Sequence, residues 1–312
     1  METTHSIFPD DVQNLISAQV PLQPFATILE TPFRLFRVAD TSVILHCIDL
    51  KTYAHGHQQA DSRYFFQQLS ERFSADNWRL IHLWEDVWRQ KTAIVVSRLR
   101  ALAGYSERIP ARLTQVRRID RPTTDRFLES NHLQVVTNVK YKYGLFLPAR
   151  YFRVLSAEFR AQLGDGAELL VAVATFSHPR QIIRDGIPHR SVELVRFANL
   201  RDCTVVGGLD KLLKAFVTDF RPDDIMTYAD RDWSDGRSYE KLEFQRLELT
   251  EPKSFWLRPG EWVRHYPNRL PDGLTENDMT AKGYIPVYNA GSRKFVKIYR
   301  NTDKADPPDT HE

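Results

Sequence analysis

The residue types best suited to group-transfer chemistry lie between positions 206 and 239. Gly207 and Gly208 open a helical pattern; glycine lets the backbone approach a phosphate closely, and the free N–H groups at a helix start favour an anion. Asp230 ends a strand-like run, where a carboxylate could take a proton from an attacking amine. Tyr239 is the candidate acid or substrate-orienting hydroxyl, and Ser234 a positioning group. The spacing therefore indicates an anion cradle followed by an acid–base pair.

Each of these positions also has a purely structural interpretation. Asp230 and Ser234 could form an Asx turn and cap the helix predicted over 236–242, with Tyr239 packed in the core. The glycine pair could equally form a tight turn. His132, just after a predicted helix, could present an imidazole to the site or serve as a cap. The candidates for donor binding are Val206, Gly207, Gly208, Leu209 and Lys211.

The hydrophobic periodicity predicts alternating strands and helices that hold these residues. In the first half we expect strands at 41–50 and 78–84, and helices at 61–73 and 88–103. In the second half we expect strands at 143–148, 168–176, 191–199, 225–228 and 244–249, and helices at 124–130, 209–220 and 236–242. The sequence therefore predicts an α/β (α+β) protein.

The charge is unevenly distributed along the chain. The 312 residues carry a net charge of +3, yet residues 89–153 hold 14 Lys and Arg against 4 Asp and Glu. Such a basic segment can bind nucleic acid, although a solvated helical face has the same composition. The candidate nucleic-acid contacts are Arg112, Arg117, Arg118, Lys140 and Lys142. DNA or another nucleic acid is thus the expected partner.

Composition and local patterns exclude several other classes. The longest apolar run, Leu169 to Phe176, is far shorter than the ~20 residues of a membrane-spanning helix, and the start shows no signal-peptide pattern. Cys47 and Cys203 are far apart, so no zinc quartet or disulfide framework is expected. We therefore expect a cytoplasmic protein with no membrane partner.

The segment from Glu193 to Phe244 resembles the GNAT-type acyltransferase fold. In that fold the fourth strand precedes a loop and helix that cradle a pyrophosphate, the next strand carries catalytic groups, and a helix ending in Tyr-x-x-x-Gly-Phe closes the site. Here Tyr239-Glu-Lys-Leu-Glu243-Phe244 matches that ending, with Glu243 in the place of glycine. The loop Val206–Leu209 differs from the standard acetyl-CoA signature. The resemblance implies an acyl-CoA or related donor.

A more specific resemblance is to a branch of the GNAT-like proteins that modifies DNA. Tyr228, Ala229, Asp230, Gly236 and Tyr239 follow the pattern of the phage branch related to the Mom protein. The wider order of motifs over residues 78–298 is similar to a two-domain family of phages and mobile elements. In that family a PD-(D/E)xK nuclease of the very-short-patch-repair type precedes the GNAT-like module.

The nuclease centre implied by this family is degenerate in the chain. His46 stands about where the strand glutamate is expected. Glu85 and Asp86 remain as candidate ligands for Mg²⁺, and a carboxylate pair at a strand end is also an ordinary helix start. The expected organisation is an N-terminal extension (1–30), a degenerate restriction-endonuclease-like domain (31–108), a GNAT-like domain (109–300) and a disordered tail (301–312).

Three functions follow from these patterns. The first is a DNA-associated transferase that acylates a nucleobase or another amine. The second is a Mg²⁺-dependent homing-type endonuclease. The third is a non-catalytic DNA-binding protein.

Overall fold

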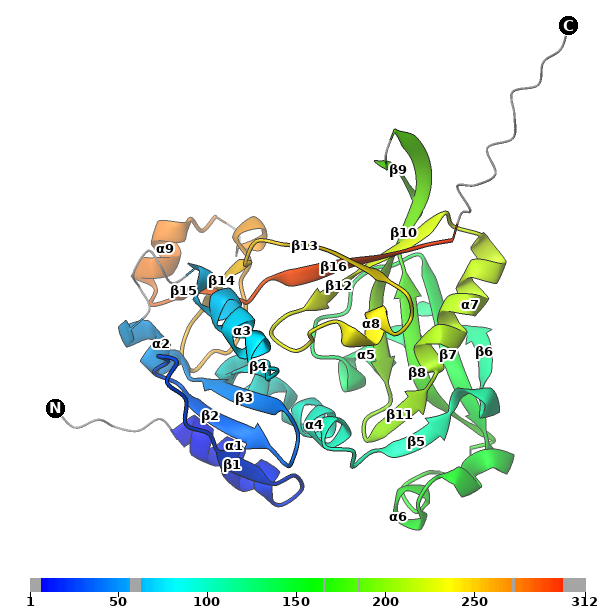
Figure 1. The fold of residues 1–312 in the computed structure, drawn as a ribbon, viewed down its shortest axis with the longest axis horizontal. Helices are drawn as coiled ribbons and strands as arrows, with labels where there is room; N and C mark the ends of the chain where they lie inside the picture. The colour runs from blue at the N-terminus through cyan, green and yellow to red at the C-terminus, as the bar shows by residue number, and fades with distance from the viewer. Residues whose placement is uncertain (1–6, 57–62, 165, 185, 271–272, 300–312) are drawn as a thin grey trace, which may run out of the picture.

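The computed structural model describes residues 7–56, 63–164, 166–184, 186–270 and 273–299. The tail expected at 301–312 lies outside the described residues. The chain forms a mixed α/β structure with two main sheets that lie side by side (Figure 1). Among the described residues, no helix combines the length and the apolar character needed to cross a bilayer.

The first sheet has four strands in the order β1-β2-β3-β4. Its strands β3 and β4 are parallel, and the other two pairings are antiparallel. Every residue of β3 is buried, as expected for a strand covered on both faces by helices. The elements are α1 (Ile7–Ser17), β1 (Leu22–Pro24), β2 (Arg34–Val38), β3 (Val43–Ile48), α2 (Leu50–Gly56), α3 (Phe65–Ala75), β4 (Arg79–Trp84) and α4 (Glu85–Leu102).

Helix α1 belongs to the core of this unit. Phe8, Val12 and Ile16 are fully buried and pack with the side chains of β2, β3 and α4. Their spacing of about four residues puts them on one face of the helix. Residues 7–24, expected as an extension, therefore share a hydrophobic core with the domain predicted over 31–108.

The second sheet follows the order β13-β16-β12-β10-β8-β7-β6, with β9 paired to the start of β10. All its pairings are antiparallel except that of β10 with β12. Its strands are β6 (Gln115–Arg118), β7 (Tyr141–Pro148), β8 (Glu168–Phe176), β9 (Arg180–Arg184), β10 (Ile187–Asn199), β12 (Asp224–Asp230), β13 (Gln245–Leu249) and β16 (Ser292–Ile298).

Helices cover both faces of this sheet. Helix α7 (Gly208–Phe220) stacks Phe216 on Phe176, with ring centroids 4.0 Å apart. Helix α5 (Arg121–Asn131) packs Phe127 against Val173 on the opposite face, because successive strand residues point to opposite sides. A short helix, α8 (Arg237–Glu240), follows β12.

A lobe formed by residues 250–291 leaves the second sheet and docks on the first unit. Its Phe255 and Val287 share a core with Trp84 and Phe66. The lobe contains β14 (Ser254–Leu257), η4 (Pro267–Arg269), α9 (Glu276–Ala281) and β15 (Ile285–Tyr288). Figure 1 shows α9, β14 and β15 beside α2 and α3, far along the chain from them. This lobe ties the two units together.

The linker between the units adds a second small sheet. Here β5 (Glu107–Pro110) pairs in parallel with β11 (Cys203–Val206), directly before the glycine pair. The remaining elements are η2 (Ala111–Leu113), η3 (Ala149–Val154) and α6 (Ala157–Arg160). The domain boundary predicted near residue 109 thus falls within a strand that supports α7.

The strands and helices expected from periodicity are confirmed, with ends within a few residues in most cases and β8 matched end to end. The short strands β1, β2, β5, β9, β11, β14 and β15 were not predicted, and neither was β16, a seven-residue strand inside the second sheet.

Candidate functional site

The two parallel strands β10 and β12 are hydrogen-bonded for only part of their length. Their paired residues are Ser191–Glu193 with Asp224–Met226, yet β10 continues to Asn199 and β12 to Asp230. The Thr227 hydroxyl donates to the Leu194 carbonyl at 3.0 Å, in place of a ladder bond. In open sheets, ligands bind outside the carboxyl ends of parallel strands. The end of this short ladder is therefore the natural place for a site.

Five side chains near the end of this ladder are linked by electrostatic interactions, and we call them the junction cluster: Arg98, His132, Arg196, Asp230 and Tyr239. They come from α4, the end of α5, β10, the end of β12 and α8. Each member interacts electrostatically with at least one other member. The structure thus brings together three of the predicted catalytic residues and adds two arginines.

Asp230 is held in place by two hydrogen bonds. Its Oδ2 accepts from the Gln134 side chain at 2.8 Å, and its Oδ1 accepts from the Asp232 N–H at 3.1 Å. The second bond is the Asx turn of the structural alternative. Asp230 is only partly buried, so the carboxylate has further acceptor capacity. Ser234 uses its hydroxyl to accept from the Gly236 N–H and so forms the following turn.

Tyr239 lies on α8 with its ring against Phe244 and Phe295, at centroid distances of 5.7 and 5.4 Å. Burial raises the pKa of its phenol, so the group remains protonated at neutral pH and can donate a proton. Gly236 starts this helix with φ of 80°, and a Cβ there would lie 2.1 Å from the Phe295 ring. The absence of a side chain at Gly236 therefore lets the Phe295 ring lie against the helix start, where the same ring packs on Tyr239.

Glu243 occupies the position where the family resemblance expects glycine. Its φ is +65°, in the left-handed region that glycine adopts most readily. The backbone at Glu243 therefore has a conformation that favours glycine, although the residue here is glutamate.

His132 is a neutral imidazole. Burial is the main cause that lowers its pKa to about 3, and the positive charges of Arg196, Arg98 and Lys91 lower it further. Its Nδ1 accepts from the Gln134 N–H at 3.1 Å, which assigns the ring proton to Nε2. His132 therefore acts as a hydrogen-bonding group and not as a cation.

Sequence analysis missed Arg98. Its guanidinium lies over the Trp233 ring, 5.3 Å from the centroid, and burial lowers its pKa to about 10, so it stays charged. The signal was present: Arg98 falls among Ile94, Val95 and Leu99, on the apolar side of the predicted helix. A charged residue within such a stripe needs a partner or a function.

The glycine pair forms the start of α7 as expected. Gly207 has φ of 78°, and a Cβ on Gly208 would lie 2.9 Å from the Val205 side chain. No side chain among the described residues caps this helix, whose first internal bond is from the Lys211 N–H to the Gly207 carbonyl. The N–H groups of the first turn are therefore available to an anion.

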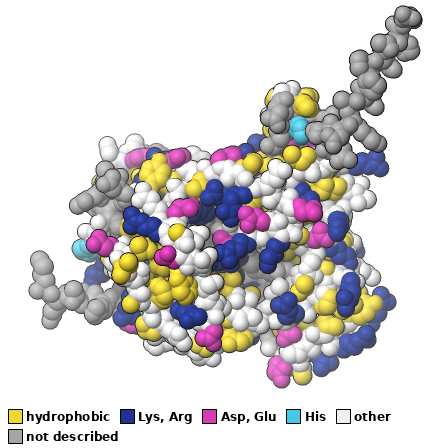
Figure 2. Space-filling model, in the orientation of Figure 1, with side chains coloured by type: hydrophobic (Ala, Val, Ile, Leu, Met, Phe, Trp, Pro, Cys, Tyr) yellow, Lys and Arg dark blue, Asp and Glu magenta, His cyan; other side chains and the backbone are white. Residues whose placement is uncertain are grey.

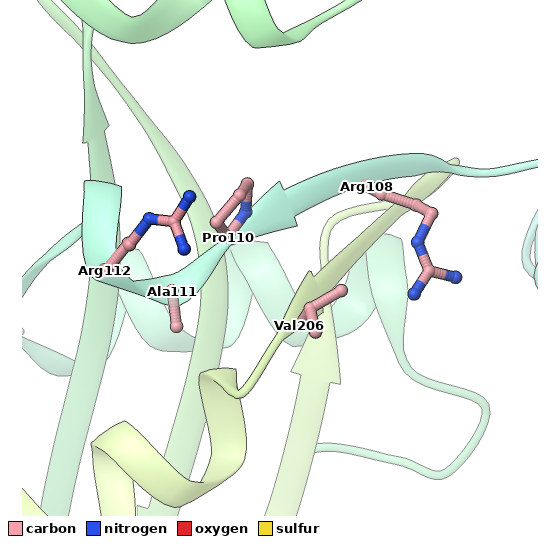
Figure 3. A pocket seen from close by; sticks show the side chains of 5 residues that line it. All are labelled: Arg108, Pro110, Ala111, Arg112 and Val206. Carbon is pink, nitrogen blue, oxygen red and sulfur yellow. The ribbon is translucent and has the colours of Figure 1, made fainter.

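A hollow of about 440 Å³ adjoins this helix start. It is lined by Arg108, Pro110, Ala111, Arg112 and Val206. Figure 3 shows the two arginines on either side of Val206, which directly precedes the glycine pair.

The side chains of two of the predicted donor-binding residues make contacts within the protein. Lys211 donates from Nζ to the carbonyls of Ala111 (2.9 Å) and Thr114. Leu209 is buried in the core. Arg108 was missed, and the charge of the basic segment was its only sequence signal.

The predicted nucleic-acid contacts do not form one face. Arg117 and Arg118 are adjacent on β6 and point to opposite sides of the sheet. Arg117 pairs with Glu168 at 2.5 Å, and Arg118 pairs with Asp219 at 3.2 Å. Lys142 donates to the Val139 carbonyl, whereas Arg112 and Lys140 are exposed.

The candidate nuclease residues are engaged in other contacts. Asp86 forms a two-bond ion pair with Arg264, at 2.6 and 3.0 Å. Glu85 accepts from the Leu50 N–H and pairs with Arg89. Among the described residues, no group of three or more His, Cys, Asp or Glu is arranged to hold a metal ion.

His46 faces a second histidine across the strands. Its Nδ1 lies 3.0 Å from Nδ1 of His82, and Thr31 and Ser70 hydrogen-bond to the two outer nitrogens. All four polar side chains therefore satisfy one another inside the first unit, where the family would place a metal-binding glutamate.

Asp232 is a buried carboxyl that sequence analysis also missed. Burial and the charge of Asp230 raise its pKa to about 8. Its Oδ1 accepts from the Ala290 N–H at 2.8 Å, and its carbonyl accepts from the His82 N–H. Asp232 thus bonds to the lobe through its side chain and to β4 through its backbone.

Comparisons with known proteins add one finding. No protein-family model matches the chain, and no curated protein is similar to it in sequence. A solved structure of a Bacillus subtilis acetyltransferase in complex with CoA is similar at a TM-score of 0.30 and 12% identity. The match covers 60% of this chain and 99% of the acetyltransferase.

Proposed function

We propose that the protein is an acyltransferase that moves an acyl group from a CoA-type thioester to an amine at the junction cluster. The observation that supports this most is the short parallel ladder of β10 and β12, with Asp230 and Tyr239 at its open end. The uncapped helix α7 begins after β10 and the short strand β11. This arrangement has the order of parts that the GNAT resemblance implies.

The donor would bind with its phosphates at the start of α7. The N–H groups of the first helical turn favour an anion, and Arg108 and Arg112 add positive charge around the adjacent hollow. A CoA-type donor carries a pyrophosphate. The positive charge at this end of the sheet therefore favours a CoA-type donor over an uncharged thioester.

The chemistry would use two proton transfers. The amine nitrogen attacks the thioester carbonyl, and a C–N bond forms as Asp230 accepts the amine proton. When the C–S bond breaks, Tyr239 donates its proton to the departing thiolate. The proton on Asp230 then passes to solvent, and the tyrosinate is reprotonated from solvent. His132 would donate a hydrogen bond from Nε2 to orient substrate.

The test uses Asp230→Asn with Asp235→Asn as a matched control. Asp235 lies in the same loop and pairs with Arg237. Both variants and the wild type are co-expressed with plasmid DNA, and the nucleosides are analysed by mass spectrometry. A modified nucleoside with the wild type and D235N, but not with D230N, supports the proposal. Unmodified nucleosides in all three rule out DNA as the acceptor.

The same proteins are then assayed with acetyl-CoA and small amines. D230N lacks the carboxylate that accepts the amine proton, and this loss should lower kcat by roughly 10²–10⁴-fold. Equal rates in D230N and D235N would contradict the role of Asp230.

We also propose association with nucleic acid, which the distribution of exposed arginines supports. Arg108, Arg112, Arg150 and Arg153 are exposed near β5, η2 and η3. Dark-blue side chains gather at the lower right edge of Figure 2. Fluorescence anisotropy of a labelled duplex should show affinity that falls steeply with salt. Salt-independent binding, or none, would exclude this role.

A further inference from the structure

Arg98 is an arginine of the first unit that reaches the site of the second. It lies on α4, while Asp230 and Tyr239 belong to the second sheet and its helix α8. Arg98 interacts electrostatically with both of them. The first unit thus contributes a charge to the junction cluster.

The guanidinium of Arg98 is held in place yet keeps its donors free. Its face lies over Trp233, a buried ring anchored by a 2.6 Å hydrogen bond from Arg79 to the Trp233 carbonyl. Among the residues that the structure describes, none accepts a hydrogen bond from Arg98, and the side chain is partly exposed. A guanidinium offers five N–H donors in a planar fork that matches a carboxylate or phosphate.

Arg196 is a less suitable ligand-binding group. Its two terminal nitrogens donate to the carbonyls of Val195 (2.8 Å) and Val135 (3.3 Å). Lys91 likewise donates to the Glu129 carbonyl. Protein carbonyls therefore hold Arg196 and Lys91 in place, although the buried Nε of Arg196 has no partner among the described residues. Arg98 is the cation here from which no described residue accepts a hydrogen bond, which leaves its whole fork for a ligand.

The surrounding charges favour an anion. Arg98, Arg196 and the neighbouring Lys91 carry three positive charges, against two carboxylates, Asp230 of the cluster and Glu193, which interacts with Arg196. His132 stays neutral and cannot balance a bound anion, but its Nε2 can donate a hydrogen bond. A bound oxyanion would lower the repulsion among the three cations.

We propose that Arg98 binds an oxyanion, carboxylate or phosphate, carried by the acceptor beside its reactive amine. The inference rests on the proposed function, because it places the acceptor at the junction cluster. It makes Arg98 a residue that determines acceptor specificity, and it gives the first unit a role in the reaction of the second.

The test compares three acceptors with acetyl-CoA as donor: phosphoethanolamine, β-alanine and 3-aminopropanol. Initial rates of thiol release give kcat/KM for the wild type and for Arg98→Met. With the preferred anionic acceptor, R98M should lower kcat/KM by about 10- to 100-fold, the usual range for a charge-assisted hydrogen bond. With 3-aminopropanol the loss should be smaller, so the ratio of kcat/KM for the anionic acceptor to kcat/KM for 3-aminopropanol should fall in R98M. An equal loss with all three acceptors, or no loss with any, would overturn the inference.

Two further variants separate charge from fold. Arg98→Lys keeps the charge without the fork and should retain more of the anionic preference than R98M. Arg100→Met is the matched control, since Arg100 lies two residues further along α4 and pairs with Asp202 at 3.3 Å. R100M should keep the wild-type preference; if it loses the preference as R98M does, the effect belongs to α4 and not to Arg98.

A donor-free measurement distinguishes this inference from the proposed function. The thermal midpoint of each protein is recorded with phosphoethanolamine or β-alanine alone, because a ligand that binds the folded state raises the midpoint. A rise in the wild type and R100M but not in R98M supports the oxyanion site even if no acyl transfer is detected. If neither compound raises the thermal midpoint of the wild type, the inference is wrong. The compound that does raise the midpoint shows whether the site binds a phosphate or a carboxylate.

Discussion

Replacing Asp232 by Asn should change how the stability of the protein depends on pH. Asp232 is 4% exposed, and burial together with the charge of Asp230 raises its pKa to about 8, against 3.8 for the ordinary side chain. The folded protein therefore holds a proton at this position that the unfolded chain releases above about pH 4. As pH rises from 4 to 8, the wild type loses stability through this group.

The size of the effect follows from the interval between the two pKa values. Each pH unit corresponds to about 1.4 kcal/mol, so the whole interval corresponds to about 6 kcal/mol. Asn has the shape of protonated Asp and can still accept the hydrogen bond from the Ala290 N–H, but it does not titrate. The free energy of unfolding of the wild type, minus that of D232N, should therefore fall by several kcal/mol between pH 4 and 8.

Urea unfolding at half-unit pH steps measures this difference directly. Titrating groups that do not interact with Asp232 contribute equally to both proteins and cancel in the subtraction, which leaves Asp232 and its interaction with Asp230. Asp235→Asn is the control, because the Asp235 side chain is partly exposed. The free energy of unfolding of the wild type, minus that of D235N, should change little over the same pH range. If the wild type and D232N give parallel profiles from pH 4 to 8, Asp232 is not a buried, protonated carboxyl at the contact between the units.

Three shorter predictions address packing, ion pairing and thiol reactivity. Gly236→Ala should lower stability by roughly 2–4 kcal/mol in urea unfolding, because its Cβ would lie 2.1 Å from the Phe295 ring at a left-handed φ; a loss below 1 kcal/mol would contradict this packing. Arg264→Met should cost about 3–5 kcal/mol by leaving Asp86 buried without its partner, and adding Asp86→Asn should recover part of that loss; two additive losses would argue against the pair. Both cysteine thiols are buried, and burial raises the pKa of each. Ellman's reagent at pH 8 should therefore label them only after unfolding. Rapid labelling of the folded protein would show that a thiol is accessible.

Much of the secondary structure was predictable from local patterns. The apolar alternation of β8 and the 3.6-residue period of α7 are properties of short windows, and both elements occur as expected. The strands that were missed are mostly edge or lobe strands of three to five residues. Such short segments carry too little alternation to be recognised without their partners in the sheet.

The candidate site was predictable only in part. Asp230, Tyr239 and His132 were found because residue type and order along the chain suffice to propose them. Their partners come from elsewhere in the sequence: Gln134 lies 96 residues before Asp230, and Arg98 lies on a helix of the other unit. No spacing rule connects such residues, because the fold and not the chain brings them together.

Local sequence was enough to predict the α/β pattern, the glycine start of α7 and the order in which the acid and hydroxyl residues follow it. These properties depend on local backbone preference and side-chain periodicity, which act over a few residues. The folded chain was needed to show that Asp86 pairs with Arg264, that His46 faces His82, and that a cation from the first unit joins the junction cluster. Such contacts depend on which surfaces are buried against each other, and burial is a property of the whole chain.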